Sequence, residues 1–207
     1  MYIEGVEVKM KDRFVNSSVL FISKYLKYDD MGIDKLKYGL ESLYMSITKL
    51  LVISIIAFIL GIFKEFLITL LLFNIIRFFG FGVHAGNSTI CLLFSSFLFV
   101  GISFLFTKIS FSIYFLLLLE IISSLVLLIY APADTVKRPL PNKKKRKIRK
   151  TLTIVVAIIY IVLTIIIKVP LSNFLCSALI LEAIMVSPLT YKFLNQPYRN
   201  YLNYKKA

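Results

Sequence analysis

A histidine and a cysteine lie close together in the glycine-rich stretch RFFGFGVHAGNSTIC, which covers residues 77–91. His84 is the only histidine of the chain, and Cys91 is one of two cysteines. An imidazole beside a thiol can form the base and nucleophile of a cysteine peptidase or an acyl transferase. These two residues are therefore the first candidates for a catalytic pair.

The pair needs a chain reversal between its members. A straight helix would separate His84 and Cys91 by about 10 Å, which is too far for direct proton transfer. Gly86, Asn87 and Ser88 between them favour a turn. We therefore predict one helix that ends near His84 and a second that starts near Cys91, so that the two side chains face each other.

Such an arrangement would favour a reactive thiol. Cys91 would lie in the first turn of its helix, where backbone N–H groups and the helix dipole stabilise a thiolate. Arg77 or a protonated His84 would add to this effect. The second cysteine, Cys176, lies within an apolar segment and has no histidine to serve it, so we interpret it as a buried structural thiol.

The glycines of the same stretch allow two interpretations. Gly80, Gly82 and Gly86 leave room for the backbone of a peptide substrate, but they would serve equally well in helix packing or turns. A zinc site is disfavoured, because one histidine and one nearby cysteine supply too few ligands. We therefore expect neither a metal nor another cofactor.

The elements that must position these residues are membrane helices. Hydrophobic residues make up 58% of the 207, and the mean hydropathy is +0.83. These values exceed those of soluble domains, and no tract alternates apolar and polar residues as a barrel strand would. We predict an all-α integral membrane protein with about six transmembrane helices, at residues 43–63, 66–83, 90–107, 111–130, 151–168 and 171–190.

The distribution of positive charge predicts the orientation of these helices. Only three of the 25 Lys and Arg residues, Lys64, Lys108 and Lys168, belong to the short connectors on one side of the bundle. By the positive-inside rule both termini, the loop of the His/Cys stretch and the segment 131–150 face the cytoplasm. The candidate site would thus lie at the cytoplasmic side of the cell membrane.

The chain before the first span predicts amphipathic helices that lie on the membrane surface. Apolar residues recur there every three or four positions, at Ile33, Leu36, Leu40, Leu43 and Ile47. Asp29 and Asp30 can cap the start of this helix. It could be only a lipid anchor, or it could also bind a peptide or a second copy of the chain. The expected organisation is an interfacial part at 1–42, a transmembrane domain at 43–190 and a cytoplasmic tail at 191–207.

The segment 131–150 carries a dense block of positive charge. Three prolines are expected to keep it extended, Pro132, Pro139 and Pro141. The basic residues follow them, namely Lys143, Lys144, Lys145, Arg146, Lys147, Arg149 and Lys150. The block could fix topology and bind anionic lipid, or it could bind an acidic peptide. Nucleic acid is disfavoured as a partner, because no folded binding module accompanies the lysines.

Two acidic residues, Glu120 and Glu182, lie inside apolar segments. A carboxylate is costly there and usually has a purpose. We interpret both as structural hydrogen-bonding or ion-pairing groups, since neither is near the His/Cys stretch in the sequence. A peptide transporter would instead depend on them.

Two motifs together resemble the accessory gene regulator B (AgrB) family. The first reads Arg77-x-x-Gly80-x-Gly82-x-His84-Ala85 and is followed by Cys91. The second reads APADT from residue 131 and leads through Arg138-Pro139 into the lysine-rich run. The resemblance covers about residues 30 to 190, and it implies six spans with cytoplasmic termini.

The resemblance also implies an activity. Members of this family are membrane cysteine endopeptidases of Gram-positive quorum sensing, which act on an AgrD-like propeptide with an amphipathic leader, a central signal sequence and an acidic tail. Their catalytic pair falls on His84 and Cys91, and their motif arginine and glycine fall on Arg77 and Gly82. The lysines of their cytoplasmic loop fall within residues 143–147.

A mechanism follows from the resemblance and the residues together. Cys91 would attack the carbonyl before the acidic tail, and an internal thiol or hydroxyl would resolve the thioester into a cyclic thiolactone or lactone. Arg77, Asn87 or helix N–H groups could stabilise the oxyanion, and Asn87 or Asp134 could orient His84. The interfacial helices are compatible with a homodimer. The alternative functions are a membrane peptide transporter and a non-catalytic scaffold.

Overall fold

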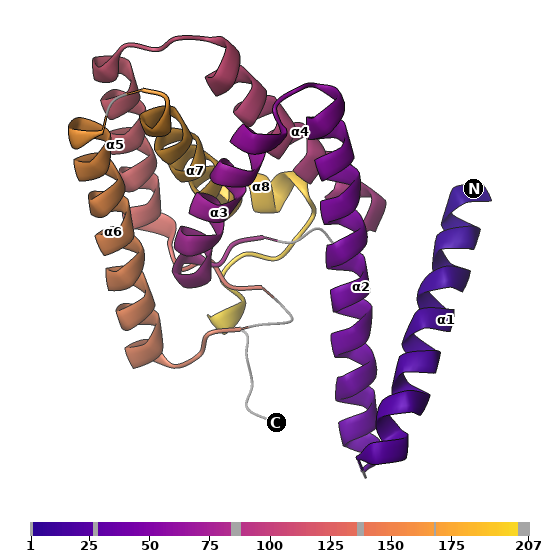
Figure 1. The fold of residues 1–207 in the computed structure, drawn as a ribbon. Helices are drawn as coiled ribbons and strands as arrows, with labels where there is room; N and C mark the ends of the chain where they lie inside the picture. The colour runs from indigo at the N-terminus through magenta and orange to yellow at the C-terminus, as the bar shows by residue number, and fades with distance from the viewer. Residues whose placement is uncertain (1, 27–28, 84–87, 136–138, 168, 203–207) are drawn as a thin grey trace. The chain divides into compact units, whose positions relative to one another are not determined.

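The computed structural model describes residues 2–26, 29–83, 88–135, 139–167 and 169–202 (Figure 1). Within this part of the chain the regular elements are helices, and an isolated β-bridge joins Phe81 to Ala133. The prediction of an all-α protein is confirmed. The chain divides into two compact units, Met1–Ile55 and Ile56–Ala207.

The first unit contains helix α1 (Tyr2–Tyr25) and most of helix α2 (Asp30–Ile59). As expected, Asp29 caps α2, because its Oδ1 accepts a hydrogen bond from the Gly32 N–H at 2.9 Å. The Phe14 and Tyr44 rings, whose centroids are 5.4 Å apart, pack the two helices together. α2 passes residue 42 without a break, so the amphipathic stretch and the first apolar segment form one helix about 45 Å long.

The second unit is a bundle built around one central helix. Its helices are α3 (Phe63–Gly80), α4 (Ser88–Lys108), α5 (Ile113–Tyr130), α6 (Lys143–Ile166), α7 (Leu171–Val186) and α8 (Pro188–Phe193), and a 3-10 turn, η1 (Asn200–Leu202), follows. α7 packs against α3, α4, α5 and α6. Thirteen of its 16 residues are buried, so α7 is a core helix on almost every face.

Polar side chains join the helices of this bundle inside the apolar interior. Such hydrogen bonds hold membrane helices together where apolar association alone gives little. They are Thr69 Oγ1 to Ser177 Oγ at 3.3 Å, Tyr160 OH to the Leu72 carbonyl at 2.8 Å, Thr164 Oγ1 to Glu120 Oε1 at 2.7 Å and Asn173 Nδ2 to the Phe106 carbonyl at 2.9 Å. Glu120 thus makes the structural hydrogen bond expected of it.

The six expected apolar segments fall in α2 to α8. Four of the helices described are long and apolar enough to cross a membrane, at Gly32–Ile59, Thr89–Lys108, Ile113–Tyr130 and Lys143–Ile166. α3 carries three charged residues, and α7 is shorter than the thickness of a hydrocarbon core. The expected segment 171–190 is divided into α7 and α8, because Ser187 caps α8 and Pro188 starts it.

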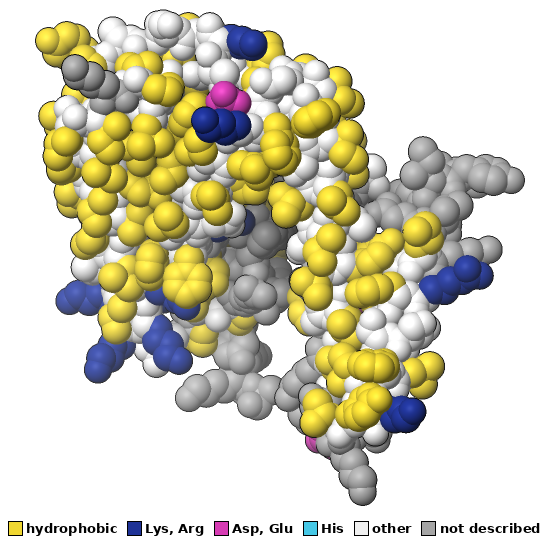
Figure 2. Space-filling model, viewed as in Figure 1, with side chains coloured by type: hydrophobic (Ala, Val, Ile, Leu, Met, Phe, Trp, Pro, Cys, Tyr) yellow, Lys and Arg dark blue, Asp and Glu magenta, His cyan; other side chains and the backbone are white. Residues whose placement is uncertain are grey.

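The outer surface of the bundle is apolar, as a lipid environment requires. Large side chains such as Phe97, Ile129 and Ile165 are between 63% and 77% exposed. Figure 2 shows hydrophobic side chains over this flank, whereas Lys and Arg gather at the end where α6 begins. The protein therefore associates with membranes through the faces of its long apolar helices.

Candidate functional site

The site is assembled where α3 ends and α4 begins. Arg77 lies in the last turn of α3, and Cys91 lies in the first turn of α4, as the sequence predicts for the thiol. α3 ends at Gly80 rather than near His84, because the chain leaves the helix at Phe81 with a positive φ of 60°. His84 and Asn87 lie outside the described residues, so their predicted roles stay predictions.

The two sequence motifs meet through their backbones. The Gly82 N–H donates to the Ala133 carbonyl at 2.8 Å, and the Ala133 N–H donates to the Gly80 carbonyl at 2.9 Å. The Val83 N–H donates to the Met185 carbonyl at the end of α7, at 3.0 Å. The residues that lead to His84 are therefore held between the segment after α5 and the central helix.

The glycines are required because the chain itself fills the space beside them. Gly82 has a φ of 125°, which L side chains rarely adopt, and a Cβ there would meet the Arg77 guanidinium and the Met185 carbonyl. A Cβ on Gly80 would meet Glu182 Oε1. Of the two interpretations of these glycines, the structure supports packing for Gly80 and Gly82.

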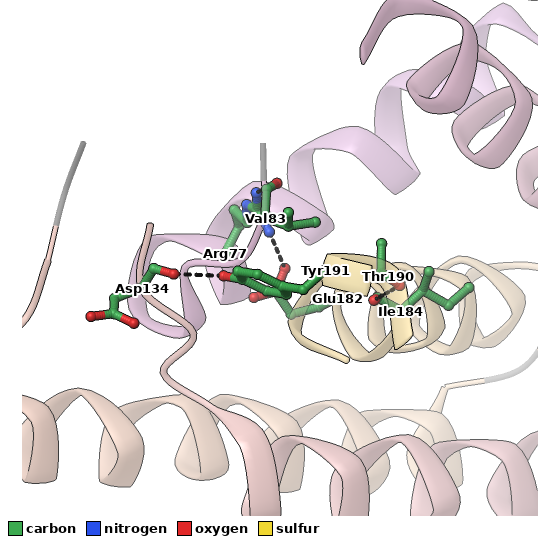
Figure 3. Close-up of polar contacts among 7 residues, drawn as sticks. All are labelled: Arg77, Val83, Asp134, Glu182, Ile184, Thr190 and Tyr191. Carbon is green, nitrogen blue, oxygen red and sulfur yellow. Dashed lines mark hydrogen bonds and ion pairs between the residues drawn. The ribbon is translucent and has the colours of Figure 1, made fainter. Parts of the chain in front are cut away.

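Arg77 is held by two partners. Its Nη2 donates to the Val83 carbonyl at 3.0 Å, and its Nη1 lies 3.6 Å from Glu182 Oε2 (Figure 3). The sequence did not connect Glu182 with this stretch, because the two residues are far apart along the chain. The signal that could have found it is a lone carboxylate on an apolar helix, which needs a basic partner inside the membrane.

A cavity of about 250 Å³ opens beside Cys91. Arg77, Asn74 and Ser95 are its polar lining residues besides the thiol. The apolar lining residues are Phe73, Val83, Phe94, Phe99, Met185 and Leu194. Cys91 is partly exposed and not in a disulfide, whereas Cys176 is buried, as predicted, with its thiol 3.7 Å from the Leu116 carbonyl. Only Cys91 is thus in a position to meet a ligand.

Asp134 organises the loop after α5. Its Oδ2 accepts a hydrogen bond from the Leu140 N–H at 3.2 Å, and its carbonyl accepts one from the Tyr191 hydroxyl at 2.8 Å (Figure 3). Burial raises the pKa of Tyr191 well above its ordinary value, so this hydroxyl keeps its proton and donates. The described contacts of Asp134 are those of a structural residue, and its role in orienting His84 stays a prediction.

The basic block is helical, which corrects the expected extended loop. Asn142 Oδ1 accepts a hydrogen bond from the Lys145 N–H at 3.1 Å and starts α6, so the prolines keep only residues before 143 out of a helix. Lys143, Lys144 and Lys145 are exposed, and no acidic side chain in the described parts of the chain pairs with them. They remain available to an external anion.

Arg149 of the same block contacts the site itself. Its Nη1 donates to the Phe78 carbonyl at 2.9 Å, and its guanidinium lies 4.3 Å from the centroid of the Phe81 ring. The first turns of α6 are therefore fastened to the end of α3. Throughout the described ranges, no group of three or more His, Cys, Asp or Glu side chains is placed to hold a metal ion.

Comparison with known proteins adds an independent line of evidence. A family model described as "Accessory gene regulator B" matches residues 15–186. An AgrB-like protein of Clostridium acetobutylicum is 33% identical over 190 residues, which is 91% of this chain and 90% of that protein. The accessory gene regulator protein B of Staphylococcus aureus strain Newman is 31% identical over 180 residues, 87% of this chain and 95% of that protein. No solved structure matches.

Proposed function

The chain belongs to the accessory gene regulator B family, which places it in accessory gene regulator quorum sensing, and on that premise we propose that it is a membrane cysteine endopeptidase that cleaves and cyclises an autoinducing-peptide precursor. The observation that carries the proposal is the position of Cys91. Its thiol lies in the first turn of α4 and lines a cavity with the motif residue Arg77.

In the proposed reaction His84 removes the proton from the Cys91 thiol. The thiolate attacks the peptide carbonyl before the acidic tail, His84 protonates the leaving amine, and a thioester joins the remaining peptide to Cys91. A thiol or hydroxyl within the bound peptide then attacks the thioester and gives up its proton to His84. The ring closes as a thiolactone or lactone, and the Cys91 thiol is restored.

The cavity supports both steps. Its wall is largely aromatic and aliphatic, so it suits an apolar side chain on the acyl side of the bond that is cleaved. A peptide that fills this space also displaces water from the thioester, which favours attack by the internal nucleophile over hydrolysis. Arg77, Gly82 and Asn87 are proposed as supporting residues, Gly82 through the backbone geometry of the loop.

The exposed lysines supply a second binding region in this proposal. Lys143, Lys144 and Lys145 form no salt bridge within the described parts of the chain, and an acidic peptide tail has the complementary charge. The amphipathic leader of the precursor would lie on the membrane beside α1 and α2, with the site on the cytoplasmic side. No further cofactor is needed for this chemistry.

Mass spectrometry of the peptide products tests the proposal. The protein is co-expressed in membranes with the precursor encoded beside its gene, as wild type, Cys91→Ala or the matched control Cys176→Ala. We expect a peptide that has lost its tail and one water with wild type and Cys176→Ala, and intact precursor with Cys91→Ala. Processing by Cys91→Ala would contradict the proposal.

Two other functions make different predictions in the same experiment. A peptide transporter would depend on Glu120, whose Oε1 accepts a structural hydrogen bond from the Thr164 hydroxyl, at 2.7 Å. A scaffold would need no particular thiol. Precursor processing that survives Glu120→Gln and is lost in Cys91→Ala therefore separates the enzyme from both.

A further inference from the structure

We propose that Glu182 is a positioning residue for the Cys91/His84 pair, acting through Arg77 on Val83, the residue directly before His84 in the sequence. This inference rests on the proposed function. It adds to that function a residue of α7 that neither sequence motif contains.

The first support is the unusual state of the Glu182 side chain. It is fully buried, and within the described parts of the chain neither carboxylate oxygen has a hydrogen-bond partner. Its charged neighbour is Arg77, with Nη1 3.6 Å from Oε2. The desolvation of a buried ion pair offsets most of the attraction between its charges, so such a pair is a weak means of stabilisation. The presence of this pair in the bundle core therefore points to a role other than stability.

The second support is the space around the pair. Glu182 Oε1 occupies the position beside Gly80 where a Cβ would lie, and the Arg77 guanidinium occupies the corresponding position beside Gly82. Both glycines belong to the stretch that leads to His84. The backbone of this stretch thus packs directly against the two side chains of the ion pair, so a movement of either side chain would also move the backbone.

The third support is the connection to His84. Arg77 Nη2 donates to the Val83 carbonyl at 3.0 Å, and the Val83 N–H donates to the Met185 carbonyl, also at 3.0 Å. Val83 is the residue directly before His84, and both of its backbone polar groups are held from within this network. Glu182 keeps the guanidinium in the orientation that reaches the Val83 carbonyl. Without the carboxylate, Arg77 is free to turn into the cavity that it shares with Cys91.

The test measures the reactivity of Cys91 and needs no peptide substrate. In a Cys176→Ala background, the rate of alkylation by iodoacetamide is followed against pH in isolated membranes, for Glu182→Gln and for His84→Ala. His84→Ala should shift the profile to higher pH, because the Cys91 thiolate would lose the imidazolium that stabilises it. We expect Glu182→Gln to shift it in the same direction by about one pH unit, a tenfold loss of reactivity at neutral pH.

The control is Glu120→Gln, which makes the same substitution at another buried acidic residue, one with no described contact to Arg77. It should leave the profile unchanged. The pH profile of the double variant Arg77→Gln/Glu182→Gln should match that of Arg77→Gln alone, because the effects of two substitutions that act through the same contacts do not add. If Glu182→Gln does not insert, Glu182→Asp is measured in its place and should shift the profile in the same direction by a smaller amount.

The outcomes separate this inference from the proposed function. A wild-type profile for the Glu182 variant beside a shifted His84→Ala profile overturns the role of Glu182 alone. Additive shifts in the double variant also overturn it. An unchanged profile for His84→Ala removes the catalytic pair, and the proposed function falls with it.

Discussion

Replacing Gly82 with alanine should disable the site while leaving the helices intact. Gly82 has a φ of 125°, and an added Cβ would lie 2.9 Å from the Met185 carbonyl as well as against the Arg77 guanidinium. Neither neighbour can move without breaking a contact to Val83. The Met185 carbonyl accepts a hydrogen bond from the Val83 N–H, and the Arg77 guanidinium donates one to the Val83 carbonyl. The substitution therefore acts on the backbone directly before His84.

The expected magnitude comes from two terms. An alanine held at this φ costs about 1–3 kcal/mol, and overpacking against a fixed carbonyl costs about 1–3 kcal/mol more. The sum is a large fraction of the stability of a typical domain, roughly 5–15 kcal/mol. The loop can lower this cost by leaving its native path. A preference of about 2 kcal/mol for the displaced loop would leave about one molecule in thirty in the active arrangement.

Gly101→Ala is the matched control. Gly101 lies inside α4, and an added Cβ would meet nothing within 4 Å. Alanine is favoured over glycine in a helix by about 0.5–1 kcal/mol, so this variant should be as stable as wild type or slightly more stable. The assay combines the thermal midpoint in detergent with precursor cleavage in membranes. Equal cleavage by Gly82→Ala and Gly101→Ala would refute the reasoning.

Three further predictions concern the binding regions and the fold. Replacing all three of Lys143, Lys144 and Lys145 by glutamine should raise the KM for the full precursor about tenfold, at about 0.5 kcal/mol per exposed ion pair, and should leave kcat unchanged. Steady-state kinetics at low and high salt would check this prediction, and an effect on kcat would contradict it. Ser95→Phe should fill the cavity and slow precursors with a large acyl-side residue, whereas an alanine at that substrate position should restore turnover, as measured by mass spectrometry. Burial raises the pKa of Tyr191, so the contribution of this hydroxyl to folding stability is present below about pH 10 and is lost as the pH rises further. Above this pH the thermal midpoint of Tyr191→Phe should therefore fall less steeply with pH than that of the wild type.

The helices were predictable from the sequence because each apolar segment is long and its ends carry strong local signals. Asp29 caps α2 as its residue type indicates. Cys91 lies in the first turn of α4, as the turn-forming residue types before it in the sequence predict. These features depend on a few neighbouring residues, and local chemistry is what a single sequence records well.

The contacts between distant segments were not predictable in the same way. In the sequence Gly80 is an ordinary helix residue shortly after an arginine, and no neighbouring residue indicates that Glu182 fills the space beside it. The pairing of Gly82 with Ala133 likewise joins motifs that the sequence shows only in order. The prolines before residue 142 suggested an extended basic segment, but the Asn142 cap starts a helix at once.

The placement of the basic block at the start of α6 is itself informative. Positive charge at a helix N-terminus opposes the helix dipole by about 0.3–1 kcal/mol per residue, so folding stability does not explain it. Arg149 and Arg146 have partners, the Phe78 carbonyl and the Tyr201 ring, which fasten this end of α6 to the bundle. The lysines have none among the described residues. An acidic tail held there would sit on a helix that is bonded directly to the turn containing Arg77, so binding would also orient the peptide toward Cys91.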